Sequence, residues 1–397
     1  MPEGEESVLI TTRAQLREFV SSLSGRDAVA VDTEFMREKT YWPRLCLVQI
    51  SDGESHAAVD PFEVGDLSPL LDIFRAPGTV KVFHAGQQDM EIFHHVLGEV
   101  PAPVFDTQVA AALASFPLQA GYGMLVSELL GVELDKMHSY TDWSKRPLAP
   151  RQIEYALADV KYLLGVYRIL RERLERAGRL EWLRRDFEEM ADPETYEVHP
   201  EEMYRRVKRR TRLNRRQMAV LRELAAWRER EAMKRDVPRQ RVVGDEALVQ
   251  MAARAPKSVD EIAATRGVND GIVRSCGTDI LAAVERGMSL PESELPHTPR
   301  RPRSRMDIDA MTDLMSALVK VRAEEYGIAG PVLASRKEMT DLAGGELEDS
   351  PLLSGWRKEH IGDDLLDLLG GRLHLAVEDG RVVVRKGAGT AAGDGGE

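Results

Sequence analysis

Short apolar runs alternate with amphipathic stretches over the first part of the chain. The runs are rich in small and β-branched residues and are bounded by turn residues, which predicts strands at residues 28–35, 45–51, 56–60, 80–84 and 104–107. Apolar residues recur at helical spacing between and after these runs, which predicts helices at residues 12–23, 67–74, 122–130 and 150–177. Strands that alternate with helices indicate an α/β domain with a mixed sheet over residues 1–180.

The rest of the chain has a mostly helical pattern. It predicts a charged helical connector at residues 181–212, a small all-α domain at 213–288, a linker rich in proline and arginine at 289–305, a second small all-α domain at 306–385 and a disordered tail at 386–397. Asp379 and Gly380 separate two apolar runs, so the second all-α domain is expected to end in a β-hairpin.

Composition limits the class of protein. With 43% hydrophobic residues the chain of 397 residues can form ordinary globular cores, and no apolar run is long enough to span a bilayer. The acidic N-terminus lacks the regions of a signal peptide, and Cys46 and Cys276 have neither zinc-binding nor redox spacing, which favours a cytoplasmic protein. The net charge of −12 argues against a protein that coats nucleic acid by charge alone. Basic residues are concentrated at residues 205–216, which form either a solvated helix face or an RNA contact.

The strand expected at residues 28–35 ends in two carboxylates, Asp32 and Glu34. Residues two apart on a strand point to the same face, so these carboxylates repel each other and lose solvation when the strand is buried. A divalent cation bound by oxygen ligands offsets both costs. The alternative is that both side chains lie beyond the strand end, in solvent.

Two more carboxylates lie near the ends of predicted elements. Asp89 lies one turn into the helix after the strand at 80–84, and Asp159 follows Tyr155 by four residues on the same helix face. These parts fit two-metal phosphodiester hydrolysis, in which ions about 3.5–4 Å apart activate a water and stabilise the leaving 3′-oxygen. Tyr155 would position the attacking water or take its proton.

Three stretches carry a family resemblance: VDTEF at residues 31–35, HAGQQD at 84–89 and YALAD at 155–159. They resemble the three motifs of DEDD-type 3′→5′ exonucleases, in the subclass with tyrosine in the third motif. Flanking stretches make the chain most similar to the ribonuclease D family, at residues 37–50, 105–108 and 141–148. The resemblance implies a ribonuclease H-like exonuclease domain with two Mg²⁺ or Mn²⁺ ions, held by Asp32, Glu34, Asp89 and Asp159.

The same resemblance suggests contacts with the end of an RNA. The backbone amide at Thr33 is expected to contact the terminal nucleotide, and Phe35 to wedge against its base. His84 is expected to contact a phosphate or a sugar. Core packing is the alternative role for Phe35, and a satisfied histidine at a strand end is the alternative for His84.

Three residues near these motifs fit structural roles better than catalytic ones. Asp106 precedes a helix and is expected to cap it rather than to act as a fifth metal ligand. Trp143 and Arg146 are expected to form a packed wall of the site.

The helical parts of the chain also resemble known domains. Residues 213–288 resemble the helical domain shared by RecQ-type helicases and ribonuclease D (the HRDC domain), which implies an auxiliary nucleic-acid-binding module. Residues 306–385 look like the second such domain of ribonuclease D, with packing or dimerisation as the alternative role.

These features predict a metal-dependent 3′→5′ exoribonuclease. The resemblance implies substrates with a single-stranded 3′ end, tRNA precursors in particular, and release of 5′-mononucleotides. The sequence indicates no protein partner and no membrane. Two alternatives stay open: a 3′→5′ DNA exonuclease, because the carboxylates do not distinguish the sugars, and a non-catalytic RNA-binding protein, which would gain nothing from so costly a cluster of charges.

Overall fold

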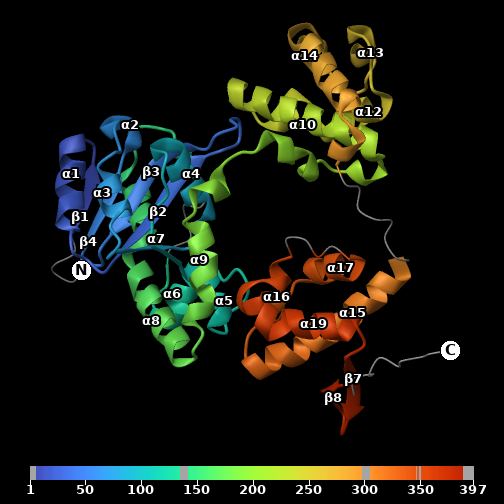
Figure 1. Ribbon diagram of the computed structural model, residues 1–397. Coiled ribbons are helices and arrows are strands. Elements are labelled where there is room, and N and C mark those ends of the chain that lie inside the picture. The colour runs from blue at the N-terminus through green and yellow to red at the C-terminus, as the bar shows by residue number, and fades with distance from the viewer. Residues whose placement is uncertain (1–5, 135–141, 297–304, 346, 348–349, 388–397) are drawn as a thin grey trace.

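A computed structural model describes residues 6–134, 142–296, 305–345, 347 and 350–387 (Figure 1). An N-terminal α/β unit is followed by a middle helical unit and a C-terminal helical unit. The predicted fold class, an α/β domain followed by helical domains, is confirmed. Most of the tail predicted at residues 386–397 lies outside the described residues.

The N-terminal unit is built on a six-stranded sheet in the order β1-β4-β3-β2-β5-β6. Its strands are β1 (Glu6–Ile10), β2 (Ala28–Met36), β3 (Arg44–Ser51), β4 (Ser55–Val59), β5 (Val80–Phe83) and β6 (Val104–Asp106). β3 is antiparallel to both of its neighbours, and the other three pairs are parallel. The predicted mixed sheet is therefore correct, although the sequence pattern does not predict the edge strand β1.

Helices cover both faces of the sheet (Figure 1). Val29 and Val31 of β2 join a core cluster with α1 (Arg13–Ser22), α3 (Leu70–Phe74) and α4 (Gln87–Leu97). Ala30 points the other way, into a cluster with α5 (Thr107–Leu113), α6 (Tyr122–Leu130) and α8 (Leu163–Arg176). A short helix, α2 (Pro61–Val64), follows β4. The alternation of small and β-branched residues along β2 thus places apolar side chains in both layers.

The helix predicted at residues 150–177 is two helices. α7 (Pro150–Lys161) ends at Tyr162, where α8 begins. α7 packs across β2, β3 and β4, whereas α8 packs against β2, β5, α5 and α6. One straight helix cannot follow both surfaces, so the prediction of a single long helix is wrong.

The predicted helical connector at residues 181–212 is mostly not α-helical. Pro193 and Pro200 each begin a 3-10 turn, because proline lacks the backbone donor that continues a helix. The connector consists of η1 (Leu180–Leu183), α9 (Arg184–Met190), η2 (Pro193–Tyr196), η3 (Pro200–Arg206) and η4 (Arg210–Arg212).

The basic run at residues 205–216 serves two roles. Its first members are exposed, namely Arg205, Arg206, Lys208 and Arg209. Its last members hold the end of the middle unit in place: Arg215 donates to the carbonyl of Glu292 at 3.2 Å, and Arg216 to that of Met288 at 3.1 Å. Arg205 pairs with Glu202 at 2.8 Å, while Arg206, Lys208 and Arg209 are exposed to solvent.

The two helical units have separate cores. The middle unit contains α10 (Arg215–Arg235), α11 (Arg239–Val242), α12 (Asp245–Arg254), α13 (Val259–Ala263), α14 (Asp270–Ser289) and η5 (Glu292–Glu294). The C-terminal unit contains α15 (Arg305–Tyr326), α16 (Gly330–Leu333), α17 (Arg336–Gly344), η6 (Pro351–Leu353), α18 (Gly355–Arg357), η7 (Lys358–Gly362), α19 (Asp363–Leu369) and the predicted hairpin of β7 (Leu373–Glu378) and β8 (Arg381–Lys386). Among the described helices, none combines the length and apolar composition needed to cross a membrane.

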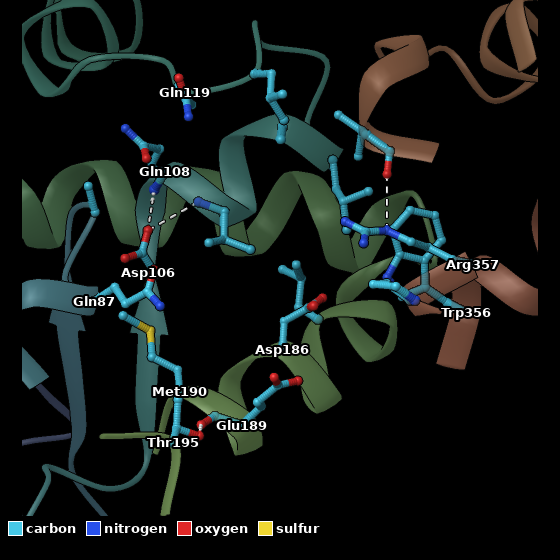
Figure 2. A pocket seen from close by; sticks show the side chains of 18 of the residues that line it. Gln87, Asp106, Gln108, Gln119, Asp186, Glu189, Met190, Thr195, Trp356 and Arg357 are labelled. Atoms are coloured by element: carbon cyan, nitrogen blue, oxygen red, sulfur yellow. Dashed lines mark hydrogen bonds between the residues drawn. The ribbon is translucent and has the colours of Figure 1, made fainter. Parts of the chain in front are cut away.

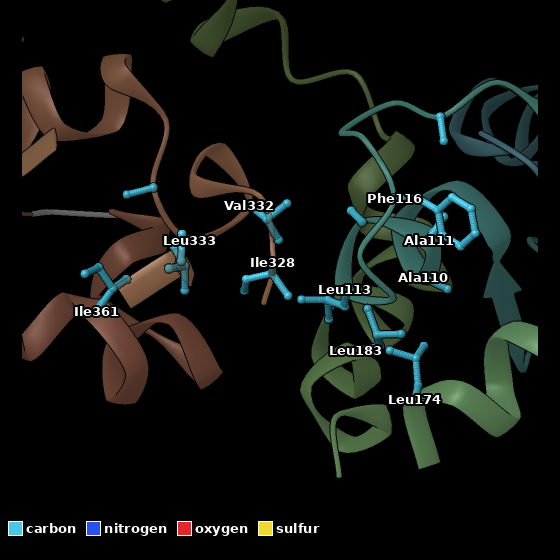
Figure 3. Packing of buried hydrophobic residues seen from close by; sticks show 14 of the residues in the cluster. Ala110, Ala111, Leu113, Phe116, Leu174, Leu183, Ile328, Val332, Leu333 and Ile361 are labelled. Carbon is cyan, nitrogen blue, oxygen red and sulfur yellow. The ribbon is translucent and has the colours of Figure 1, made fainter. Parts of the chain in front are cut away.

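The C-terminal unit shares a core with the N-terminal unit. Figure 3 shows Ile328 and Val332 facing Leu113 across the boundary, and these residues belong to one continuous buried cluster. Trp182 of the connector stacks on Trp356 with ring centroids 5.1 Å apart. The C-terminal unit therefore has a packing role within the chain, and its removal would expose apolar residues of the N-terminal unit.

A loop of the N-terminal unit docks on the middle unit. The loop joins β2 to β3, and its Tyr41 is buried with its hydroxyl bonded to Glu229 of α10. Asp236, at the end of α10, accepts hydrogen bonds from the amides of Tyr41 and Trp42, each at 3.0 Å. Trp42 stacks on His95 of α4 with ring centroids 4.2 Å apart. The loop thus joins the middle unit to the N-terminal unit.

We expect Asp236→Gly to loosen this docking by roughly 1–3 kcal/mol, because it removes an acceptor that serves two amides. Glycine tolerates the positive φ of 48° at this position, so the effect reports the lost carboxylate and not backbone strain. Asp236→Asn keeps an acceptor and is the matched control. The measurement is the rate of tryptic cleavage at the exposed basic residues 205–209 of the connector under native conditions. Equal rates for wild type and Asp236→Gly would contradict a role of Asp236 in docking the loop.

Candidate active site

The end of β2 places Asp32 and Glu34 at the edge of the N-terminal unit. Both side chains are half-buried, so the alternative of a fully solvated strand end does not hold. β3 lies alongside them, with Gln49 opposite Asp32 and Leu47 opposite Glu34. The predicted arrangement of two carboxylates on one face of a core strand is therefore what the fold contains.

A β-bulge follows this pair of carboxylates. β3 carries one extra residue, Cys46, opposite the step from Glu34 to Phe35. Arg146 supports the bulge, since its guanidinium donates to the Cys46 carbonyl at 2.7 Å and pairs with the buried Asp60. Arg146 is thus part of the wall beside the site, and its charge is paired with Asp60 and not with the four carboxylates.

The turn from β5 to α4 places Asp89. Ala85 has a φ of 58°, and a Cβ at Gly86 would lie 2.5 Å from the Cβ of Phe83, so this turn requires glycine at position 86. Asp89 then lies in the first turn of α4, where it is buried and accepts a hydrogen bond from the Thr33 hydroxyl. Thr33 is the residue between the two carboxylates of β2, so this bond links the first and second motifs.

Asp106 is a helix cap, as predicted. Its carboxylate accepts hydrogen bonds from the amides of Gln108 and Val109 at the start of α5, at 2.8 and 3.1 Å. Its other oxygen accepts from the amide of Gly86 at 2.8 Å. One buried side chain therefore fixes both the start of α5 and the turn that positions Asp89.

α7 brings Asp159 and Tyr155 to the end of β2. The ring of Tyr155 stacks on the buried Trp143 with centroids 6.4 Å apart. Tyr122, to which the sequence gives no functional role, donates its hydroxyl to the carbonyl of Ala158 at 3.1 Å. Nothing in the local sequence of Tyr122 signals this position, because it depends on how α6 packs against α7 and α8.

Burial raises the pKa of each of the four carboxylates. Burial first, and then the charges of Asp89, Asp159 and Glu34, raise the pKa of Asp32 well above its usual range. Burial with the charges of Asp159 and Asp89 raises the pKa of Glu34 to about 8. Burial also raises the pKa of Asp89 and of Asp159 to about 7 each, although the bond from Thr33 opposes the rise in Asp89. Ionising these four carboxylates in the folded protein therefore has a high electrostatic cost.

This charge pattern fits a site for divalent cations. In the described part of the chain, no lysine or arginine forms an ion pair with any of the four carboxylates. No three of the four carboxylates bring one oxygen each within 4.8 Å of one another. In this structure the four side chains are therefore spread more widely than the ligands of a single ion. Oxygen donors without a positive side chain are the ligands that hard divalent cations prefer.

The three residues predicted to contact substrate each make contacts within the protein. Thr33 has its hydroxyl bonded to Asp89, and Phe35 packs against the core cluster behind the strand. His84 has its Nδ1 at 2.9 Å from the hydroxyl of Thr107, and burial lowers the pKa of its imidazole. These contacts correspond to the packing alternatives for Phe35 and His84.

A pocket of about 540 Å³ lies beside the cluster, between the N-terminal and C-terminal units (Figure 2). Asp106, Asp186 and Glu189 line it on one side and Trp356 and Arg357 on the other. None of the four carboxylates lines this pocket. The carboxylates on which the predicted chemistry depends therefore lie outside this cavity.

Comparison with family models supports the division of the chain into parts. Residues 7–175 match the model of the 3′-5′ exonuclease family. Residues 217–284 match the model of the HRDC domain. The three motif stretches lie within the first match, and the exposed basic connector lies between the two.

Comparison with whole proteins covers nearly all of the chain. A protein named ribonuclease D from Gluconacetobacter diazotrophicus is 45% identical over 379 residues, which is 95% of this chain and 96% of that relative. A second, from Acidiphilium cryptum, is 44% identical over 96% of this chain and 98% of its own length. The crystal structure of Escherichia coli RNase D, titled an exoribonuclease involved in structured RNA processing, is 36% identical, with a TM-score of 0.83 over 92% of this chain and 99% of that one.

We expect the metal-free protein to show the cost of the cluster as a pH effect. The native pKa of Glu34 is raised above its unfolded value, so between about pH 5 and 8 the native state holds more protons, and stability from this group falls as pH rises. The Glu34→Gln variant has no carboxylate to ionise at this position and so avoids this loss of stability. Its free energy of unfolding at pH 8 should exceed that of wild type by roughly 0.5–2 kcal/mol.

Calorimetry in chelator at pH 5.5 and pH 8 measures this difference, and the comparison between the two proteins cancels the contribution of the histidines. An excess of Mg²⁺ should reverse the order, because cations that bind the native wild type stabilise it. A gap between wild type and Glu34→Gln that does not change with pH would contradict the raised pKa.

Proposed function

Because this chain belongs to the ribonuclease D family and is a 3′→5′ exoribonuclease, we propose that it trims the single-stranded 3′ ends of tRNA precursors by two-metal hydrolysis, releasing 5′-mononucleotides. The observation that carries the proposal is the cluster of four carboxylates that no basic side chain of the described chain neutralises. A protein that only binds RNA would gain nothing from this arrangement, since phosphates are repelled by it.

The proposed ligands of the cations are Asp32, Glu34, Asp89 and Asp159. Mg²⁺ and Mn²⁺ both suit carboxylate ligands. When bound, such a pair of ions supplies a hydroxide-like water at neutral pH and stabilises the leaving 3′-oxygen. The contribution of the protein is to hold the four carboxylates on a strand and two helices, each packed against a core.

We assign Tyr155 the role of orienting the attacking water. Burial and the charges of Asp159, Glu34 and Asp32 raise the pKa of its phenol, so the hydroxyl is protonated at neutral pH. A protonated phenol both donates and accepts hydrogen bonds, which suits orientation of a water better than removal of its proton. The stack on Trp143 limits the movement of the ring.

The proposed substrate contacts are the Thr33 amide, the Phe35 ring and His84. They lie along the same edge of the sheet as the carboxylates, on β2 and at the end of β5. The HRDC match at residues 217–284 and the exposed basic connector supply surfaces for the body of an RNA. The named activity of the E. coli relative, structured RNA processing, supports a folded RNA with a free 3′ tail as substrate. Such a substrate is consistent with a cytoplasmic site of action, as are the two free cysteines.

The test is the degradation of a 5′-labelled RNA that ends in a single-stranded 3′ tail, with Mg²⁺, with Mn²⁺ and with chelator. We expect a ladder that shortens from the 3′ end and requires metal. Asp32→Asn should slow it by roughly 10³-fold, because it removes a ligand that the proposed ions share. Tyr155→Phe should slow it by roughly 10²-fold with RNA binding unchanged.

Tyr122→Phe is the matched control for the phenol, because it removes a hydroxyl near the same carboxylates that is bonded to a backbone carbonyl. It should stay within a few-fold of wild type. A DNA of the same sequence tests the sugar: faster shortening of the DNA would contradict the RNA substrate. No shortening of either, with RNA still bound, would contradict hydrolysis altogether.

A further inference from the structure

β3 carries a polar side chain at a fully buried position. Gln49 is 0% exposed, and neither its amide nitrogen nor its amide oxygen has a hydrogen-bond partner. A buried amide without a partner is costly, because folding removes the hydrogen bonds that water gave it. A residue kept at such a cost is expected to acquire a partner in another state of the protein.

The register of the sheet places Gln49 beside a proposed metal ligand. Gln49 lies directly opposite Asp32 of β2, and Ala58 of β4 lies on its other side. Residues directly opposite in antiparallel strands share a face, with Cβ atoms about 4.5–5.5 Å apart. α7, which carries Asp159, packs over this part of the sheet (Figure 1).

The other neighbours along β3 on this face do not offer the amide an equivalent partner. Leu47, two residues before Gln49, is apolar. Ser51, two residues after it, already lies at 2.7 Å from the imidazole of His56 and accepts from the amide of Gly53 at 2.9 Å. Of the residues directly paired with Gln49 across the sheet, Asp32 is the one whose side chain can accept a hydrogen bond from the amide.

We propose that Gln49 is a positioning residue for Asp32, whose carboxylate receives a hydrogen bond from the buried amide when the site holds its cations. The inference rests on the proposed function, because it takes Asp32 as a metal ligand. An amide suits this role better than lysine or arginine would. It orients a carboxylate without cancelling the negative charge that attracts the cation.

The contrast between the two pairs on this face supports the assignment. Glu34 is opposite a leucine, so a residue that only fills space is compatible with the same sheet and the same covering helix. Packing alone therefore does not require a glutamine opposite Asp32.

The variant that tests the proposal is Gln49→Met, which keeps the length of the side chain and removes the amide. We expect its affinity for Mg²⁺ and Mn²⁺, measured by isothermal titration calorimetry, to fall by about 10-fold or more. Its melting temperature in chelator should equal or exceed that of wild type, because the variant no longer buries an unpartnered amide. Leu47→Met, on the same strand and face, is the matched control and should keep wild-type affinity.

Two comparisons separate the possible failures. Wild-type affinity in Gln49→Met, together with a clear loss in Asp32→Asn, would overturn the role of Gln49 and leave the proposed function intact. Unchanged metal binding in Asp32→Asn would instead overturn the assignment of the metal ligands.

A crystal structure of the wild type with Ca²⁺ provides a test that does not depend on the folding of a variant. A Gln49 nitrogen within hydrogen-bond distance of an Asp32 oxygen would support the proposal. An amide turned toward any other group would overturn it.

Discussion

Repulsion among four carboxylates at one edge of a sheet is the constraint that the surrounding structure has to withstand. Asp32, Glu34, Asp89 and Asp159 come from three elements, and burial raises the pKa of each. The charges of neighbouring members raise the pKa of Asp32 and Glu34 further. A chain free to move would separate these groups. They stay together because β2 is an inner strand of the sheet and because α4 and α7 are packed against opposite sides of it.

The supports of the site share one chemical property: they orient the cluster without neutralising it. Thr33 donates to Asp89 through a hydroxyl, and Asp106 fixes the turn before α4 through backbone amides. Arg146 lies close to β2, but Asp60 takes its charge. A lysine or arginine within the cluster would stabilise the empty protein and would compete with a divalent cation for the same oxygens.

The sequence was most informative where chemistry depends on spacing within one element. The pairs Asp32 with Glu34 and Tyr155 with Asp159 follow from strand and helix periods, and the fold places both as expected. The Asp106 cap follows from the residue type before a helix. These inferences need no knowledge of how distant parts of the chain meet.

Features that depend on tertiary packing were wrong or absent in the prediction. The break at Tyr162 exists because α7 and α8 follow different surfaces, and the burial of Tyr41 exists because α10 covers it. The shared core of the N-terminal and C-terminal units joins residues that lie far apart in the chain. Gln49 reads as an ordinary strand residue until the register shows that Asp32 lies opposite it.

The loop that docks on the middle unit also fixes the distance between that unit and the four carboxylates. Tyr41 and Trp42 lie in the loop that joins β2 to β3, and Trp42 stacks on His95 of α4, the helix that carries Asp89. The middle unit is therefore held, through this loop, against β2 and α4, the two elements that carry three of the four carboxylates. For an RNA held on the middle unit, as proposed above, the fold sets the distance from the body of the RNA to the four carboxylates. A 3′ tail shorter than this distance cannot reach the carboxylates however firmly the body is held.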